Sequence, residues 1–174
     1  GSMEDIDNIA VIEDDGTIVT PFNFFDLKGR AVRFTPVAAA GSYRVSIRQA
    51  DLNPDFGNKL SLSDDDTREF VFSGTLHFPY FGVIYSSVFV SSDGNVTFFR
   101  GDSEFTERDV SHLNSGPPRI APFLVDLDPT VGQGAVFVNQ LSDRVMITWH
   151  MVREWDTFRE NTFQLSLFPD GNFE

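Results

Sequence analysis

The sequence contains no cysteine, which excludes disulfides, cysteine-based zinc sites and thiol nucleophiles together. It also lacks any apolar run that approaches the roughly 20 residues of a membrane-spanning helix. Its first residues, GSMEDIDN, show no signal-peptide pattern, and Gly1-Ser2 before Met3 resembles an expression scar. These absences are compatible with the cytosol and equally with a secreted protein large enough to fold on its core alone.

Positive charge is scarce. The chain has 13 Lys and Arg residues against 26 Asp and Glu residues, for a formal net charge of −13. Phosphate backbones and anionic lipid surfaces repel such a chain, so we expect no nucleic-acid partner and no membrane insertion. Cations and basic protein surfaces are the partners that this charge favours.

Tyrosine and tryptophan are also scarce, with 3 Tyr and 2 Trp beside 19 Phe. Phe has no polar group and serves mainly to fill space, whereas Tyr and Trp dominate binding surfaces. The aromatic content is therefore predicted to lie mostly in the core, which weighs against a sugar-stacking platform. A length of 174 residues and a hydrophobic content of 41% are typical of one globular domain, alone or with an arm.

Short extended runs dominate what is present. In SYRVSIRQ, residues 42–49, apolar and polar side chains alternate strictly, which is typical of a strand with two unlike faces. The preceding runs GTIVTPFNFFDL and RAVRFTPV are joined by KGR, whose glycine predicts a turn. A loop rich in Asn, Pro, Asp and Gly follows at 51–59.

Three hairpins are predicted further along the chain. In YSSVFVSSDGNVTFFR, Asp93-Gly94 predicts a type I′ turn, because glycine tolerates positive φ. GAVFVNQLSDRVMITWHMV is expected to turn at LSD, and NTFQLSLFPDGNFE at Asp170-Gly171. The chain stops just after that last turn, so we expect either that the protein continues or that its final strand is an open edge.

One segment, TERDVSHL, predicts a helix over 106–113. Thr106 is the expected N-cap, with Asp109 completing a capping box, and the glycine and prolines of NSGPP end the helix. One short α-helix among many strands predicts an all-β fold, an antiparallel β-sandwich. The 51–59 loop is the expected boundary between an N-terminal strand arm, 1–59, that pairs onto the core and a main unit, 60–174.

The segment APFLVDLDPT places two carboxylates, Asp126 and Asp128, two positions apart in an apolar run. On a strand both would share one face, roughly 6–7 Å apart for a rise of about 3.3 Å per residue. We favour a structural role, in which Asp128 accepts backbone N–H bonds in an Asx turn before Pro129 and Thr130. A calcium site is the alternative, and a glycosidase-like carboxylate pair is a weaker one.

A second acidic cluster lies in SDDDTRE, at Asp64, Asp65 and Asp66. A solvated turn is the preferred interpretation, and a calcium site is the functional one, since calcium takes six to eight oxygen ligands. No EF-hand pattern is present, so calcium binding requires separate loops to converge. The candidate calcium ligands are Asp64, Asp65, Asp126 and Asp128, and no other cofactor is expected.

Catalytic signatures are missing. None of the three histidines, His77, His112 and His150, stands at a metal-ligand spacing with another. No nucleophile elbow, Walker A loop or dinucleotide fingerprint occurs. The residues therefore predict a non-enzymatic β module.

Several segments together resemble a known family. LHFPYFGVIYSSVFVSSDGNVTFF, SGPPRIAPFLVDLDPT and the three final strands follow, in order, the pattern of the nidogen-like extracellular domain. The forms SGPPRIAP and DLDPT are similar to versions found in bacterial secreted proteins. The resemblance covers roughly residues 70–174, and no single motif in it is very specific.

The resemblance implies a non-catalytic interaction or adhesion module of a larger protein, extracellular or at the cell surface. It implies a protein or glycan partner there or in the matrix, and no catalytic residues. Asp126 and Asp128 fall on the family's acidic positions, with Pro122 and Trp149 on its framework. The alternative function is a calcium-dependent or carbohydrate-binding module.

Overall fold

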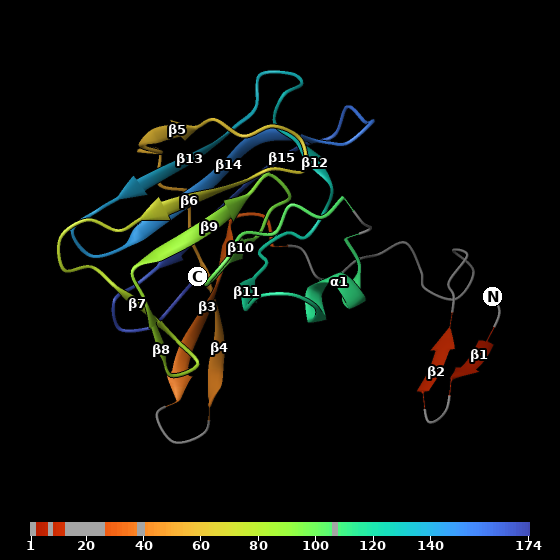
Figure 1. The fold of residues 1–174 in the computed structure, drawn as a ribbon, viewed down its shortest axis with the longest axis horizontal. Helices are drawn as coiled ribbons and strands as arrows, with labels where there is room; N and C mark the ends of the chain where they lie inside the picture. Colours follow the sequence, from red (N-terminus) through yellow and green to blue (C-terminus); the bar gives the residue numbers. More distant parts are fainter. Residues whose placement is uncertain (1–2, 7–8, 13–26, 38–40, 106–107) are drawn as a thin grey trace.

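The computed structural model describes residues 3–6, 9–12, 27–37, 41–105 and 108–174 (Figure 1). As the alternating patterns predict, the fold is an antiparallel, sandwich-like all-β structure with one short helix. No helix in these ranges is long and apolar enough to cross a membrane.

The first sheet has four strands in the order β11-β10-β9-β6. They are β6 (Thr67–Val71), β9 (Ser87–Ser91), β10 (Val96–Thr97) and β11 (Arg119–Ile120). The pairing of β9 with β10 confirms the predicted hairpin. A separate small hairpin, β7 (Phe78–Tyr80) and β8 (Val83–Tyr85), connects β6 to β9.

The second sheet is centred on β14 (Val145–Glu154). β14 pairs with β13 (Ala135–Gln140) and β15 (Glu160–Leu167), as the second predicted hairpin requires. β5 (Asn58–Leu60) adds to β13, and the short β12 (Leu127–Asp128) pairs with the last two residues of β14. The register between β14 and β15 shifts between Trp149 and Val152, where Met151 takes a φ of 54°.

A third pairing joins β3 (Arg30–Val37) to β4 (Ser42–Gln49). Phe173 links this hairpin to the second sheet, because Phe34 and Phe173 exchange two backbone hydrogen bonds while Phe173 also bridges Leu167. The Phe34 and Phe173 rings stack with centroids 4.6 Å apart. β1 (Met3–Ile6) and β2 (Ile9–Ile12) pair only with each other among the described strands. Most of the predicted run GTIVTPFNFFDL lies outside the described residues.

The core lies between the two sheets. Val88, Val90 and Val96 of the first sheet share one buried cluster with Ile147 and Trp149 of the second. The Trp149 indole N–H donates to the Ser91 carbonyl across the sandwich, at 3.0 Å. Burying a Trp that satisfies its one donor in this way fixes the two sheets face to face.

Phenylalanine is divided between core and surface. Phe72, Phe78, Phe98 and Phe173 are buried, as expected. Four other phenylalanines are exposed by 59–89%, namely Phe81, Phe99, Phe105 and Phe158. The prediction that Phe serves the core therefore holds for only part of the set.

The helix begins later than expected. α1 spans Val110–Asn114, and its N-cap is Asp109, whose carboxylate accepts from the His112 N–H at 2.9 Å. Asp109 is therefore the cap and not the third residue of a capping box; the predicted cap, Thr106, lies outside the described residues. Arg108 is held in ion pairs away from α1, which keeps it out of the helix.

The Asp93-Gly94 turn lies where predicted but is not of the predicted type. A type I′ turn needs positive φ at both central residues, and only Gly94 has it, at 69°. The Ser91 N–H donates to the Asn95 carbonyl, so three residues form the loop. The type I′ prediction was wrong because the Asp93 side chain is anchored in the interior, as described below.

Candidate functional site

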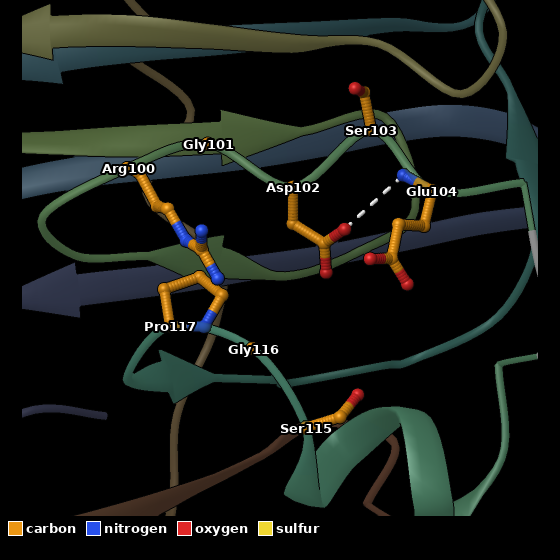
Figure 2. A pocket seen from close by; sticks show the side chains of 8 residues that line it. All are labelled: Arg100, Gly101, Asp102, Ser103, Glu104, Ser115, Gly116 and Pro117. Atoms are coloured by element: carbon orange, nitrogen blue, oxygen red, sulfur yellow. Dashed lines mark hydrogen bonds between the residues drawn. The ribbon is translucent and has the colours of Figure 1, made fainter.

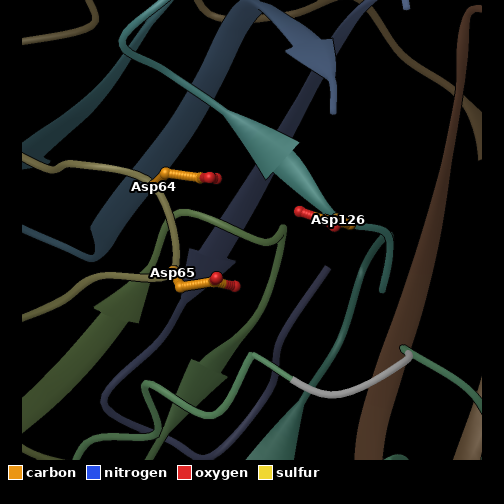
Figure 3. A group of neighbouring side chains, drawn as sticks. All are labelled: Asp64, Asp65 and Asp126. Atoms are coloured by element: carbon orange, nitrogen blue, oxygen red, sulfur yellow. The ribbon is translucent and has the colours of Figure 1, made fainter. Parts of the chain in front are cut away.

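Three carboxylates predicted from separate segments converge at one corner of the sandwich. Asp64 and Asp65 come from the loop between β5 and β6, and Asp126 comes from the segment before β12 (Figure 3). Each offers one oxygen, and these oxygens all lie within 4.8 Å of one another. We call Asp64, Asp65, Asp93, Asp126 and Asp128 the acidic corner.

Local hydrogen bonds explain how adjacent aspartates separate. Asp66 turns back on its own loop, because its carboxylate accepts from the backbone N–H groups of Ser63 and Thr67, at 3.1 and 2.8 Å. Asp65 adopts a left-handed φ of 50°. Asp64 and Asp65 therefore face Asp126, while Asp66 stabilises the loop.

The two aspartates of APFLVDLDPT, Asp126 and Asp128, have different structural roles. The Asp128 carboxylate accepts from the Thr130 N–H at 2.8 Å and from the Thr130 hydroxyl at 2.5 Å, which confirms the predicted Asx turn. Asp126 is placed by its backbone, whose carbonyl accepts from the Trp155 N–H at 2.9 Å. Asp128 is buried and is not one of the three converging carboxylates, although it is close enough to Asp64 to act on its charge.

Two residues of the site were missed by the sequence analysis. The side chains of Asp93 and Arg108 are only 2% and 5% exposed. Arg108 Nη2 donates to Asp93 Oδ2 at 2.5 Å and to Asp65 Oδ1 at 2.7 Å, and the other Asp93 oxygen accepts from the Leu127 N–H. The sequence shows Asp93 only as a turn residue and Arg108 only as part of a helix pattern, so neither carried a signal.

Gly94 allows this arrangement by its lack of a side chain. A Cβ on Gly94 would lie 1.9 Å from the Phe123 carbonyl oxygen. The Phe123 N–H in turn donates to the Gly94 carbonyl, at 3.2 Å. The turn thus lies directly against the APFLVDLDPT segment, which brings Asp93 beside the strand that follows Asp126.

The acidic corner is short of positive charge. Burial, together with Asp128, Asp65, Asp126 and Asp93, raises the pKa of Asp64 to about 6. Burial, then the charges of Asp93 and Asp65, also raises the pKa of Asp126 despite Arg108 nearby. One oxygen each of Asp64 and Asp126, the Oδ1 atom, is buried without a hydrogen-bond partner among the described residues.

This geometry suits a hard cation. Calcium binds oxygens at 2.3–2.6 Å, so two oxygens on one ion lie at most about 5 Å apart, which the converging carboxylates satisfy. Asp64, Asp65 and Asp126 could supply three ligands. Arg108 already forms an ion pair with Asp65, so a bound cation and this guanidinium would both contact the Asp65 carboxylate.

A second charged cluster is centred on Asp102, which lines a pocket between the 100–104 loop and the end of α1 (Figure 2). The Asp102 carboxylate lies 3.0 Å from His112 Nε2, accepts from Arg119 Nη2, and also accepts from the Glu104 N–H. Burial alone would raise the pKa of Asp102, but Arg119 and these hydrogen bonds hold it below its ordinary value. This cluster ties β11, α1 and the 100–104 loop together.

Comparisons with known proteins found no match to any family model, curated protein or solved structure.

Proposed function

We propose that the chain is a non-catalytic interaction module of a secreted or cell-surface protein, and that its acidic corner binds calcium. The observation that carries the calcium part is the convergence of the Asp64, Asp65 and Asp126 oxygens within 4.8 Å. The extracellular part is supported by the resemblance of residues 70–174 to the nidogen-like pattern.

The energetics of the corner support a cation. Burying a carboxylate oxygen without a hydrogen-bond donor costs free energy. A neighbouring carboxylate increases that cost by charge repulsion. The Arg108 guanidinium interacts with Asp93, Asp65 and Asp126, while four carboxylates surround Asp64. Asp64 and Asp126 each retain a buried oxygen with no partner among the described residues. A divalent cation would supply the missing positive charge and would coordinate the oxygens that lack a partner.

A binding role is also favoured over hydrolysis. A glycosidase needs two carboxylates that are free to act on a substrate. Asp128 uses one oxygen in two hydrogen bonds to Thr130, and Asp126 faces Asp64 and Asp65. A cation ligand set explains this arrangement better than an acid–base pair does.

The test is the thermal unfolding midpoint, Tm, of the full chain with and without calcium. Ligand binding to the folded state alone stabilises it by about 2.7 kcal/mol at a ligand concentration 100 times Kd. We expect millimolar CaCl₂ to raise the Tm by several degrees, and Asp64→Asn/Asp126→Asn to remove that shift. Asp143→Asn is the matched control, because the Asp143 side chain is 58% exposed in the turn between β13 and β14.

NaCl at the same ionic strength separates specific binding from screening. If NaCl raises the Tm as much as CaCl₂ does, or if the double variant keeps the full shift, the calcium proposal is wrong.

A glycan is the second candidate ligand, and one observation favours it. Trp155 is 55% exposed, and its backbone N–H donates to the carbonyl of Asp126. An exposed indole on a residue whose backbone binds that of a candidate ligand can stack on a sugar whose hydroxyls bind the ion. A glycan array run in calcium and again in EDTA tests this; an absence of hits in calcium would refute it.

A further inference from the structure

β4 lies at an open end of the second sheet. Phe173 bridges β15 to Phe34 of β3, and β4 pairs with β3 along its full length without a register shift. No other strand in the described part of the chain pairs with β4, and Figure 1 shows β3 and β4 extending away from the rest of the sheet. An eight-residue edge without a bulge is a template for pairing with a further strand.

The backbone groups of alternate β4 residues point towards this open edge. Phe34 of β3 bonds Phe173 with both its N–H and its C=O, so it offers neither to Val45, which lies opposite it in β4. Hydrogen-bonded and non-bonded pairs alternate along two antiparallel strands. The β4 residues whose backbone groups face the open edge are therefore Tyr43, Val45 and Ile47. These donors and acceptors have no partner among the described residues, and a further strand would satisfy them.

One face of β4 is apolar and exposed. Val45 and Ile47 are 54% and 53% exposed, and Tyr43 shares their face because side chains two positions apart lie on one side of a strand. The ring of Phe81, a residue 59% exposed, meets the Tyr43 ring with centroids 5.3 Å apart. The apolar surface therefore continues from β4 onto the β7–β8 hairpin.

We propose that β4 pairs with β4 of a second copy of this chain, antiparallel and about a twofold axis at Val45. In this register Val45 lies opposite Val45 of the second copy, and Tyr43 lies opposite its Ile47. Apolar side chains thus meet across the axis, and the outward backbone groups of the two strands bond each other. One patch serves both copies, as a twofold interface requires. The pairing is independent of the cation at the acidic corner.

The charges on the other face of β4 select this register. Arg44 would lie opposite Ser46 of the second copy, and Arg48 opposite its Ser42, so no two arginines face each other. An axis at Ser46 would instead place Arg44 opposite Arg48, and an axis at Arg44 would place Arg44 opposite itself. Arg48 also keeps its ion pair with Glu174 of its own chain, at 2.6 Å. The β4 edge is therefore complementary to itself about Val45, which is why the occupant is a second copy.

A single introduced cysteine tests the register, because the chain has none of its own. Val45→Cys should form a disulfide between two copies under mild oxidation, since opposite Cα atoms of a bonded antiparallel pair lie about 5.5 Å apart, within the span of a disulfide. Ile47→Cys is the matched control, on the same face and equally exposed. Its two copies would lie about 14 Å apart along the strands, four residues at about 3.4 Å each, and should not cross-link. Non-reducing gel electrophoresis measures both yields.

Sedimentation equilibrium of the chain without cysteine measures the pairing itself. We expect a concentration-dependent monomer–dimer equilibrium. Val45→Lys should weaken the dimer by about tenfold or more, because two lysines would meet at the axis. An equimolar mixture of Val45→Lys and Val45→Glu should restore the dimer, because lysine then lies opposite glutamate. Val71→Lys, at a site 64% exposed on β6, is the control and should leave the dimer unchanged.

Circular dichroism establishes that each variant is folded. A chain that stays monomeric at all concentrations overturns the proposal, whether its β4 edge is free or covered by its own residues. So does an Ile47→Cys variant that cross-links as fast as Val45→Cys, or a mixture of the two charged variants that fails to associate.

Discussion

The structure holds two clusters of buried or partly buried charged side chains, one with an excess of carboxylates and one in which a carboxylate is paired. In the acidic corner, the guanidinium of Arg108 offsets Asp93, Asp65 and Asp126 in part, while Asp64 lies among four other carboxylates. In the Asp102 cluster, one carboxylate is shared by Arg119 and His112. The pKa of Asp64 is raised by burial and by its neighbours, whereas the pKa of Asp102 is lowered by its partners in spite of burial. A buried charge with its partners in place holds neighbouring elements together. A buried charge without enough opposite charge around it is available to bind a ligand.

Removing Arg108 should have the largest effect. Arg108→Met keeps most of the apolar stem but leaves Asp93, 2% exposed, without its cation. Breaking a buried pair from one side costs about 3–5 kcal/mol of the free energy of unfolding. Urea unfolding measures this loss. Arg159→Met, at an exposed site, should change stability little. If Arg108→Met is as stable as the wild type, the corner is not held by this ion pair.

Gly94→Ala should rank next, because it disturbs the backbone that places Asp93 in the corner. The new Cβ would overlap the Phe123 carbonyl oxygen, at 1.9 Å, in addition to the unfavourable φ of 69°. We expect a loss of about 3 kcal/mol by thermal unfolding. Gly29→Ala is the matched control, with the same φ and no atom within 4 Å, and should lose only about 1 kcal/mol. Equal losses would show that the Phe123 contact is unimportant.

Asp102→Asn tests the balanced cluster. The amide keeps the shape but removes the charge that Arg119 and His112 share, which should cost about 2 kcal/mol of unfolding free energy. Asp64→Asn should instead increase the unfolding free energy at pH 7 without calcium, because it removes repulsion between carboxylates. Chemical denaturation of both variants decides the point: a loss of stability in both would remove the distinction between the clusters.

The pH dependence should be the smallest effect. The folded pKa of Asp64, about 6, lies above its ordinary 3.8, so the stability from this group is fully present below 3.8 and is lost as pH rises through 6. Asp102 has the opposite pH dependence. Its pKa is lowered in the folded state, so the stability from this group is present above pH 3.8 and is lost as pH falls through the folded-state pKa. The Tm of Asp64→Asn relative to the wild type should therefore rise between pH 4 and pH 7, and saturating calcium should abolish that rise. A flat difference without calcium would contradict the raised pKa.

Much of the fold could be predicted from the sequence. Alternation in SYRVSIRQ corresponds to β4, and the hairpins at 87–97 and 135–154 form where the turn residues stand. Part of the site could be predicted too, since Asp64, Asp65 and Asp126 were named as candidates and converge. The helix start could not be placed, because ion pairs to distant residues hold Arg108 outside α1.

The sequence by itself determined the strands of the two main hairpins, the positions of their turns and the Asx turn at Asp128, because each depends on residues a few positions apart. Only the tertiary structure decided which carboxylates share one corner. Asp64 and Asp126 come from loops far apart in the sequence, and Asp93 meets Arg108 and Leu127 only after the β9–β10 turn lies against Phe123. The charge imbalance that makes this corner a candidate cation site is a sum over such distant partners, so no local pattern encodes it.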